Sequence, residues 1–381
     1  MRASVWRASI LLLLFGSLAC NPTHIRQPVW SLTFPERAMD RKVIVRQASL
    51  YCVTASLYSA TRLTLSKVAA EDGHIIWQKG IETASNLSSD KVLIGEGVLV
   101  YRTPSGSVKA LDVNTGNQEW ENQDFNDLLA IANQRVYVAD KDWRYCVLDS
   151  ISGSVVQTGN STMSSSCRLV IDNGRQYFVN KGRLVASDLQ TGRTLWEYQT
   201  PGAMAISQIA SALGNLYASN RNELSCLDEE TGAVRWRYPF SGDVPELVSN
   251  DFYVAEDTKT EGTKVVKLDA QTGAAQTVLR ADIEFGSDRR VLFRDGAVYN
   301  PISETHYGYN PIRYLVGEEK ALSRDAWMTA ISVTDGHVLW SSEKYWCDEE
   351  IKPIIGDGRI VFAVSGVNLG NSSKLVAYSM K

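Results

Sequence analysis

Short apolar segments recur along the chain, and each is followed by a polar turn that contains glycine. Val108–Leu111 and Leu184–Ala186 are two of these segments. Apolar runs of this length, bounded by turn residues, are typical of buried β-strands. Tyrosine and tryptophan, which favour strands, are plentiful, whereas proline is scarce. The pattern therefore predicts a strand-rich chain.

The turns share an eleven-residue motif, Ala-x-Asp-x-x-Thr-Gly-x-x-x-Trp, in which x is any residue. Residues 110–120 and 186–196 match it fully, and residues 226–236 carry Cys226 in place of the first alanine. Weaker copies centre on Gly73, Gly153, Gly273 and Gly336. The turn glycines are separated by 43, 37, 39, 40, 41 and 63 residues. The motif positions that we single out are Asp112, Gly116, Trp120, Asp188, Gly192, Trp196, Asp228, Gly232, Trp236, Trp77 and Trp340.

Each motif position has a physical reason. The aspartate side chain can accept hydrogen bonds from turn amides, and glycine supplies the positive φ that a tight hairpin requires. The tryptophan lies on an outer strand, where its ring can cover the junction with a neighbouring blade while its indole N–H needs an acceptor. We therefore interpret the motif aspartates as turn formers rather than catalytic acids. A period of about 40 residues leaves room for four strands, which is the size of a β-propeller blade.

Seven such units and one unit divided between the chain termini make eight blades. Lys374–Tyr378 has the pattern of the strand before a turn, and Val29–Phe34 has that of the outer strand after it. Pairing these two segments in one blade would close the ring and remove its open edges. We predict an all-β fold, an eight-bladed β-propeller of four-stranded antiparallel blades that forms one domain over residues 29–381. Seven blades is the alternative, if one weak copy is not a full unit.

The N-terminal residues have the composition of an export signal. Basic residues precede the apolar run Ile10–Phe15, and small residues lead from it to Cys20. This arrangement predicts a signal peptide over residues 1–19, with an apolar run too short to span a bilayer. Its end is typical of a lipoprotein signal, although Ser17 replaces the usual leucine. We expect an acylated Cys20 and a tether over residues 20–28; an ordinary signal peptide with an incidental cysteine is the alternative.

Charge and reactive side chains argue against several functions. The net charge of −4 is unsuited to general nucleic-acid binding. The histidines, His24, His74, His306 and His337, have no zinc-like spacing. The cysteines besides Cys20 are Cys52, Cys146, Cys167, Cys226 and Cys347. We expect buried single thiols for most of them, with Cys146–Cys167 the least implausible disulfide, and we predict no metal site, no cofactor and no catalytic residue.

The motif of residues 110–120, 186–196 and 226–236 resembles the tryptophan-docking motif of the pyrroloquinoline-quinone (PQQ) enzyme-type repeat. Two groups carry this repeat at eight blades: the quinoprotein dehydrogenases, and the outer-membrane assembly lipoproteins of the BamB family. The chain looks like the second group in length, in its signal and in having no appended domain. The resemblance to dehydrogenases would imply PQQ, calcium and commonly a disulfide between adjacent cysteines, and the sequence has no adjacent cysteine pair.

The interval between Gly273 and Gly336 exceeds the repeat by about 20 residues, which predicts an insertion near residues 303–324. Propeller insertions project from one face, where loops bind partners. We single out Tyr307, Tyr309 and Tyr314 because exposed tyrosines suit protein interfaces. A tolerated loop elaboration is the alternative interpretation.

Three functions remain, in order of preference. The first is a non-catalytic, monomeric scaffold, anchored through Cys20 at the periplasmic face of an outer membrane. The resemblance implies partners among envelope proteins, including the β-barrel assembly machinery; in a cell with one membrane, a surface binding module remains. The second is a propeller that binds a small ligand or glycan in its central funnel, as a sensor would. The third is a PQQ-dependent dehydrogenase.

Overall fold

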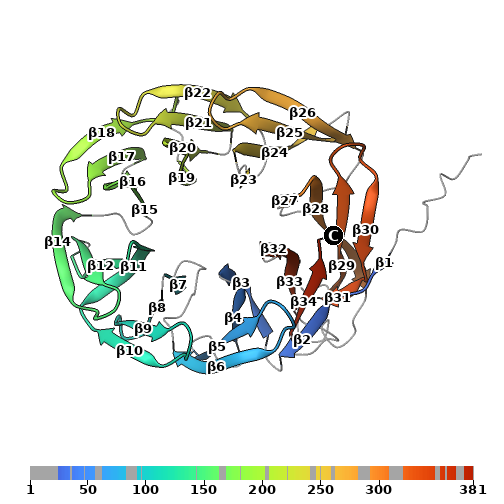
Figure 1. Cartoon of the computed structure of the whole chain (residues 1–381), viewed down its shortest axis with the longest axis horizontal. Helices are drawn as coiled ribbons and strands as arrows, with labels where there is room; N and C mark the ends of the chain where they lie inside the picture. The colour runs from blue at the N-terminus through green and yellow to red at the C-terminus, as the bar shows by residue number, and fades with distance from the viewer. Residues whose placement is uncertain are drawn as a thin grey trace, which may run out of the picture.

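The strands form eight antiparallel sheets arranged as the blades of a ring (Figure 1). The computed structural model describes residues 25–380, except 35–36, 47, 56–61, 83–91, 96, 143, 163–168, 181, 202–205, 221, 241–245, 249, 259–261, 282–291, 309–320, 348–351, 357 and 366–372. Seven sheets have four strands and the eighth has six. The described residues contain no helix long and apolar enough to cross a membrane.

We number the blades in chain order and give their strands from the inner to the outer edge. Blade 1 comprises β3 (Arg37–Arg46), β4 (Ser49–Ala55), β5 (Arg62–Ala69) and β6 (Ile75–Glu82). Blade 2 comprises β7 (Val92–Ile94), β8 (Val98–Arg102), β9 (Val108–Asp112) and β10 (Gln118–Asn122). Blade 3 comprises β11 (Phe125–Ala132), β12 (Arg135–Asp140), β13 (Arg144–Asp149) and β14 (Val155–Thr162). Blade 4 comprises β15 (Leu169–Asp172), β16 (Arg175–Asn180), β17 (Arg183–Asp188) and β18 (Thr194–Tyr198).

The second half of the ring repeats this order. Blade 5 comprises β19 (Gln208–Ala212), β20 (Asn215–Ser219), β21 (Glu223–Asp228) and β22 (Val234–Pro239). Blade 6 comprises β23 (Glu246–Val248), β24 (Asp251–Thr258), β25 (Gly262–Asp269) and β26 (Ala275–Ala281). Blade 7 comprises β27 (Leu292–Arg294), β28 (Ala297–Gly308), β29 (Ala321–Ser332) and β30 (Val338–Ser342), with β1 (Ile25–Arg26) and β31 (Tyr345–Cys347) added. Blade 8 comprises β32 (Lys352–Gly356), β33 (Arg359–Ser365), β34 (Ser373–Ser379) and β2 (Trp30–Phe34).

Blade 8 closes the ring by pairing the two ends of the chain. Strand β2 lies antiparallel to β34, with Trp30 opposite Ala377 and Phe34 opposite Ser373. The predicted pairing of the termini is therefore confirmed, and so is the eight-bladed fold; the seven-bladed alternative is wrong. Closure leaves every blade flanked by two neighbours, so that both faces of each sheet are covered and only short strand edges remain.

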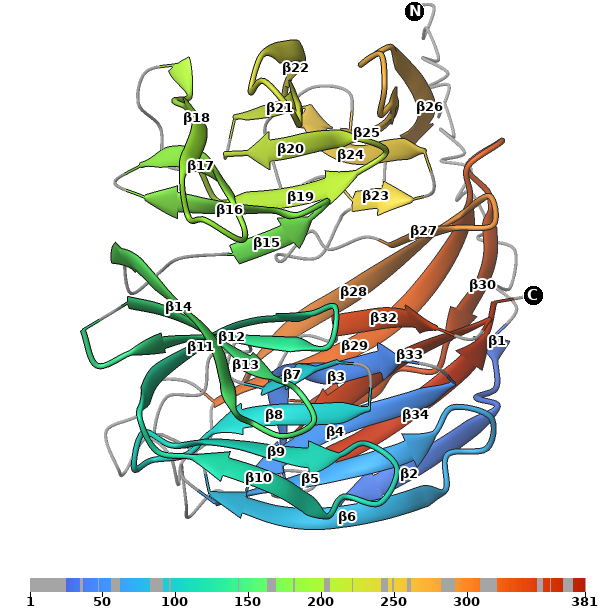
Figure 2. The same ribbon diagram turned by 60° about the vertical axis from the view of Figure 1, so that its left-hand side comes forward.

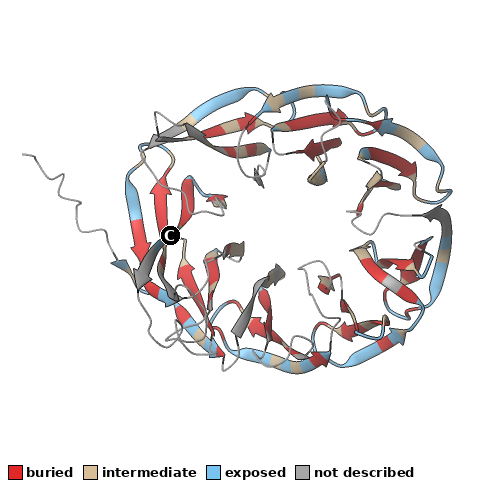
Figure 3. Ribbon diagram, turned by 180° about the vertical axis from the view of Figure 1, so that it is seen from behind, coloured by how far each residue is buried: buried red, intermediate tan, exposed pale blue. Residues whose placement is uncertain are grey.

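The apolar core lies between blades, because each sheet is hydrophobic on both faces. Val100 and Ala110 of blade 2 pack with Val136 and Leu148 of blade 3 in one buried cluster. Figure 3 shows buried residues concentrated on the middle strands, while the outermost strands carry most of the exposed ones. Since each blade needs its neighbours to bury both faces, the ring is the folding unit.

Strand order divides the connections between two rims of the ring. The turns between a blade's first and second strands, and between its third and fourth, lie on one rim, which we call the turn rim. The connections between second and third strands, and between blades, lie on the other, which we call the loop rim. All seven motif glycines have positive φ, between 69° and 77°, and lie on the turn rim. The long β28–β29 hairpin reaches toward the loop rim (Figure 2).

Candidate partner-binding site

Tryptophans on the outer strands join five of the blades to the next. In these blades the indole Nε1 donates to a backbone carbonyl in the turn of the following blade: Trp30 to Ala70 at 2.9 Å, Trp77 to Val113 at 3.1 Å, Trp120 to Ser150 at 2.8 Å, Trp196 to Glu229 at 3.1 Å and Trp236 to Ala270 at 3.1 Å. The ring faces the turn glycine of that blade so closely that a Cβ on Gly153 would lie 2.5 Å from Trp120. Glycine is thus required twice, for its positive φ and for the space that the indole occupies.

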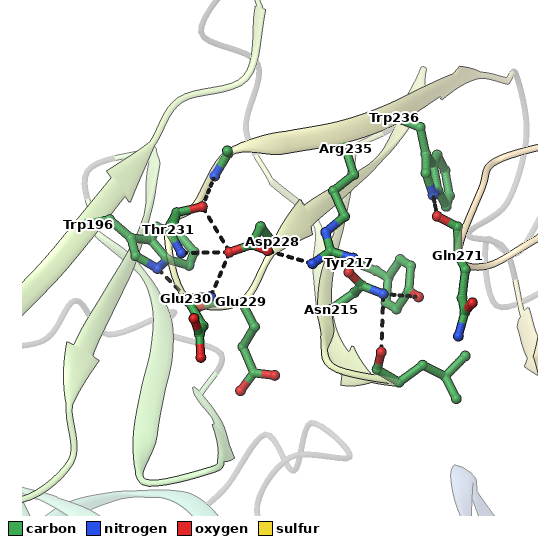
Figure 4. A network of polar contacts seen from close by, with 12 residues as sticks. Trp196, Asn215, Tyr217, Asp228, Glu229, Glu230, Thr231, Arg235, Trp236 and Gln271 are labelled. Atoms are coloured by element: carbon green, nitrogen blue, oxygen red, sulfur yellow. Dashed lines mark hydrogen bonds and ion pairs between the residues drawn. The ribbon is translucent and has the colours of Figure 1, made fainter.

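The motif aspartates organise the same turns. Asp228 Oδ1 accepts from Thr231 N at 2.9 Å and from Thr231 Oγ1 at 2.8 Å, and its Oδ2 is 2.5 Å from Arg235 Nη2 (Figure 4). The hydrogen bonds from Arg235 and then Thr231 hold the pKa of this carboxyl well below its ordinary value. Asp112, Asp188 and Asp269 make equivalent bonds to Thr115, Thr191 and Thr272. These carboxylates are occupied in turn formation, as the motif indicates.

Three blades depart from the tryptophan joint. In blade 3 the tryptophan position holds Gln157, whose Nε2 donates to Leu189 O at 3.0 Å and Gln190 O at 3.1 Å of blade 4. In blade 6 the position holds Thr277. In blade 7, Trp340 is buried, and its Nε1 finds no acceptor among the described residues.

Strand β1 completes the joint between blades 7 and 8. It lies parallel to β30, with Arg26 opposite Ser342. The Arg26 guanidinium lies 5.0 Å from the Trp340 ring centroid, and its Nη1 donates to Ser379 O at 2.8 Å. Tyr378 stacks on Trp340 with ring centroids 5.6 Å apart. Arg26 thus covers the Trp340 ring, whereas at other joints the tryptophan ring lies against a turn glycine.

Blade 7 also has the longest hairpin of the described chain. Strands β28 and β29 have 12 residues each and stay in register from Ala297 opposite Ser332 to Gly308 opposite Ala321. On its outer side, β31 pairs with β29, with Trp346 opposite Asp325. We refer to residues 303–308, 321–327 and 343–347 as the blade 7 projection.

The projection carries an aromatic and charged cluster. Lys344 Nζ lies 4.4 Å from the ring centroid of Trp327 and 3.1 Å from Glu304 Oε2. Trp346 is 39% exposed, although tryptophan is usually buried. The cluster therefore offers a cation, a carboxylate and an unburied indole close to one another.

A buried network holds β31 against blade 8. The Tyr345 hydroxyl donates to Glu343 Oε1 and lies 2.7 Å from the Tyr378 hydroxyl. Burial, and then the hydrogen bonds to Tyr378 and Glu343, raise the pKa of Tyr345 far above its ordinary value. Lys374 Nζ lies 5.3 Å from the Tyr345 ring centroid. This packing gives the projection a rigid base, since its third strand is joined to the next blade.

The structure does not describe the side chains of several residues that were singled out from the sequence. Residues 1–24, including Cys20, and Tyr309 and Tyr314 lie outside the described residues. Tyr307 belongs to β28, where only its backbone is described. Sequence reasoning missed Trp327, Lys344 and Glu304, because they come together only across paired strands. The neighbouring aromatic pair at residues 345–346 was the available signal, and it is also what a strand end would show.

The remaining cysteine and histidine side chains that the structure describes form no cluster. Cys52, Cys146 and Cys226 are buried, free thiols, whereas Cys167 lies outside the described residues. His74 and His337 are exposed and lie beside Asp72 and Asp335 in their turns. Within the described part of the chain, no group of three His, Cys, Asp or Glu side chains is placed to hold a metal ion.

Comparisons with known proteins agree with this architecture. A family model described as outer membrane protein assembly factor BamB matches residues 61–275. BamB from Moraxella catarrhalis is 16% identical, over 92% of this chain and 98% of that chain, with a TM-score of 0.54. The computationally designed Ika8 protein is 13% identical, over 93% and 100%, with a TM-score of 0.59.

A third solved structure represents the other PQQ-repeat group. A europium-containing methanol dehydrogenase is 13% identical, over 93% of this chain and 93% of that chain, with a TM-score of 0.54. No curated protein sequence matches. At these identities the solved structures establish the fold alone, which is shared by a designed protein, an assembly factor and an enzyme.

Proposed function

The chain belongs to the family of the outer membrane protein assembly factor BamB, and from that membership we propose that it is a non-catalytic scaffold that binds envelope proteins. A lipid on Cys20 would anchor it at the periplasmic face of an outer membrane. Its partners would include components of the β-barrel assembly machinery. The ring itself would act as a monomer, because its eight blades close without a second chain.

The observation that carries this proposal is the blade 7 projection. Its Trp346 is 39% exposed, and Lys344 lies between Trp327 and Glu304. Protein interfaces are enriched in tryptophan, and the energy of binding concentrates in such aromatic anchors. The β28–β29–β31 pairing presents these groups on strands, which position an interface more precisely than a loop does.

The chemistry of the motif supports a non-catalytic role. Asp112, Asp188 and Asp228 each accept hydrogen bonds from the amides and threonine hydroxyls of their own turns. Their pKa values are lowered, so these groups are poor general acids or bases near neutral pH. The aspartates that recur in the motif therefore stabilise its turns.

Crosslinking in intact cells tests the proposal. After mild crosslinking and detergent solubilisation, captured proteins would be identified by mass spectrometry for the wild type, Trp346→Ala and Lys344→Glu. We expect the wild type to capture β-barrel assembly proteins, and both variants to capture at least about tenfold less, as expected for loss of a hot-spot contact.

Lys141→Glu is the matched control, because Lys141 is also an exposed lysine on the loop rim, in blade 3. It should capture the same proteins as the wild type. Cys20→Ala should leave the protein in the soluble periplasmic fraction. A wild type that captures no assembly protein, or projection variants that capture as much as Lys141→Glu, would contradict the proposal.

A further inference from the structure

Exposed apolar side chains gather on the outer edge of three consecutive blades. Every outer strand has two positions directly before the tryptophan position. In blade 7 these hold Val338 and Leu339, in blade 8 Pro28 and Val29, and in blade 1 Ile75 and Ile76. Apart from Pro28, these side chains are 39–50% exposed. We refer to these six residues, with Ile25, as the apolar edge.

A β-bulge explains why two consecutive apolar residues are exposed. The register shifts between Lys67 and Val68 in blade 1, and between Ala330 and Ile331 in blade 7, so an extra residue is inserted before the tryptophan. The extra residue turns away from the blade instead of into its core. Both turns also share the sequence Asp-Gly-His before the apolar pair.

Other blades fill the same two positions differently. Blade 2 holds Gln118 and Glu119, blade 4 Thr194 and Leu195, blade 5 Val234 and Arg235, and blade 6 Ala275 and Gln276. Blade 3 alone among these other blades has an apolar pair, Val155 and Val156. The fold therefore does not require apolar residues there, and blades 7, 8 and 1, which carry such pairs, follow one another around the ring.

The described part of the chain begins at the outer edge of blade 7, with β1. Strand β1 lies along the outer edge of β30, with Ile25 opposite Ser341, and precedes by one residue the apolar pair of blade 8, Pro28 and Val29 (Figure 1). Arg26 holds it there through Ser379 and Trp340. Only four residues separate Cys20 from Ile25. A chain of that length spans at most about 18 Å when fully extended.

We propose that the apolar edge rests on the surface of the lipid bilayer that holds the acylated Cys20. This inference rests on the proposed acylation, and it specifies which part of the ring faces the membrane. A short tether pinned by Arg26 keeps the edge within reach of the lipid head groups, where Val, Ile and Leu side chains can enter the interface. The exposed acids Glu71, Asp72 and Asp335 on the same edge favour a zwitterionic surface over an anionic one.

Depth-dependent fluorescence quenching tests the proposal. Leu339→Cys and the control Val156→Cys would each carry an NBD fluorophore on the full chain, reconstituted in phosphatidylethanolamine–phosphatidylcholine vesicles that contain spin-labelled lipid. The unmutated chain, labelled in parallel, gives the background. We expect quenching at residue 339 to exceed that at residue 156 several-fold, and to weaken when phosphatidylglycerol replaces half of the lipid.

The control is matched, since residues 339 and 156 occupy the same bulge position of their outer strands. Thermal unfolding of both labelled chains confirms that each is folded. Equal quenching at the two positions, in vesicles that carry the chain, would overturn the proposal and leave the edge to a protein partner.

Mass spectrometry of the mature chain shows whether Cys20 is acylated, and so distinguishes a wrong surface contact from a missing lipid anchor. If Cys20 is unmodified, its thiol would be coupled to maleimide-phosphatidylethanolamine in the same vesicles, and the quenching would be compared again. Stronger quenching at residue 339 would then support the surface contact without the native acylation. Equal quenching there would overturn it independently of the anchor.

Discussion

A tryptophan is buried both at the joint between blades 2 and 3 and at the joint between blades 7 and 8, but different groups cover it. At the first, Trp120 lies against Gly153 and donates to Ser150 O at 2.8 Å. At the second, Trp340 has no acceptor among the described residues and is covered by the Arg26 guanidinium. The first joint is built from residues about 30 apart in the chain, whereas the second needs a segment from the other terminus. Ring closure therefore replaces a local turn with a long-range contact.

Removing the tryptophan of the repeat joint should have the largest effect. Trp120 is 7% exposed, so Trp120→Ala leaves a large cavity and an unpaired Ser150 carbonyl. We expect the free energy of unfolding to fall by about 3–5 kcal/mol, measured by urea denaturation. Trp346→Ala serves as the control and should cost less than about 1 kcal/mol, because that side chain is 39% exposed. A small loss for Trp120→Ala would show that the joint does not hold the blades together.

The second largest effect concerns the turn glycines, which are needed both for their positive φ and for the space that an indole occupies. Gly153 and Gly192 have φ values of +69° and +71°, but only at Gly153 would a Cβ meet an indole. We expect Gly192→Ala to cost about 1 kcal/mol through the positive φ alone, and Gly153→Ala to cost about 1–3 kcal/mol more. Thermal denaturation would measure both. In a Trp120→Ala background the excess at Gly153 should disappear; if it persists, the indole is not its cause.

The closing joint should be the weaker of the two. Arg26→Ala removes the cation over Trp340 and the hydrogen bond to Ser379 O at 2.8 Å. We expect a loss of about 1–2 kcal/mol in the free energy of unfolding, from one cation–π contact and one hydrogen bond. Urea denaturation followed by circular dichroism would measure it. Arg183→Ala is the control, since Arg183 is exposed and forms a surface ion pair with the exposed Glu197. Equal losses in the two variants would show that β1 contributes nothing to closure.

The smallest effect should be the pH dependence of a motif turn. The Asp228 pKa is lowered in the folded chain by Arg235 and Thr231, whereas in the unfolded chain it is about 3.9. Its contribution to stability is therefore complete above that unfolded pKa and is lost as the pH falls toward the folded one. The urea midpoint of Asp228→Asn should lie below that of the wild type at pH 7, and the difference should shrink below about pH 4. A difference that is constant from pH 7 to pH 3 would contradict this assignment.

The fold could be predicted from the sequence because the information that specifies it is local and repeated. The motif places a turn former, a glycine and a tryptophan within eleven residues, and each copy predicts one blade from short-range chemistry. Counting the copies, with one unit split between Val29–Phe34 and Lys374–Tyr378, was enough to predict eight blades and their closure. Spacing alone also indicated where the chain departs from the repeat, between Gly273 and Gly336.

Which side chains meet at the sites of interest could be seen only in the folded chain. Gln157 takes over a tryptophan's position by bonding to blade 4, and Arg26 reaches Ser379 across 353 residues of sequence. Lys344 meets Glu304 across 40 residues, because β31 pairs with the far end of β29. Contacts of this kind depend on the curvature of the ring and on strand register, which no short window of sequence contains. The blades are encoded locally, whereas the surfaces proposed to bind partners and membrane are set by how the ring closes.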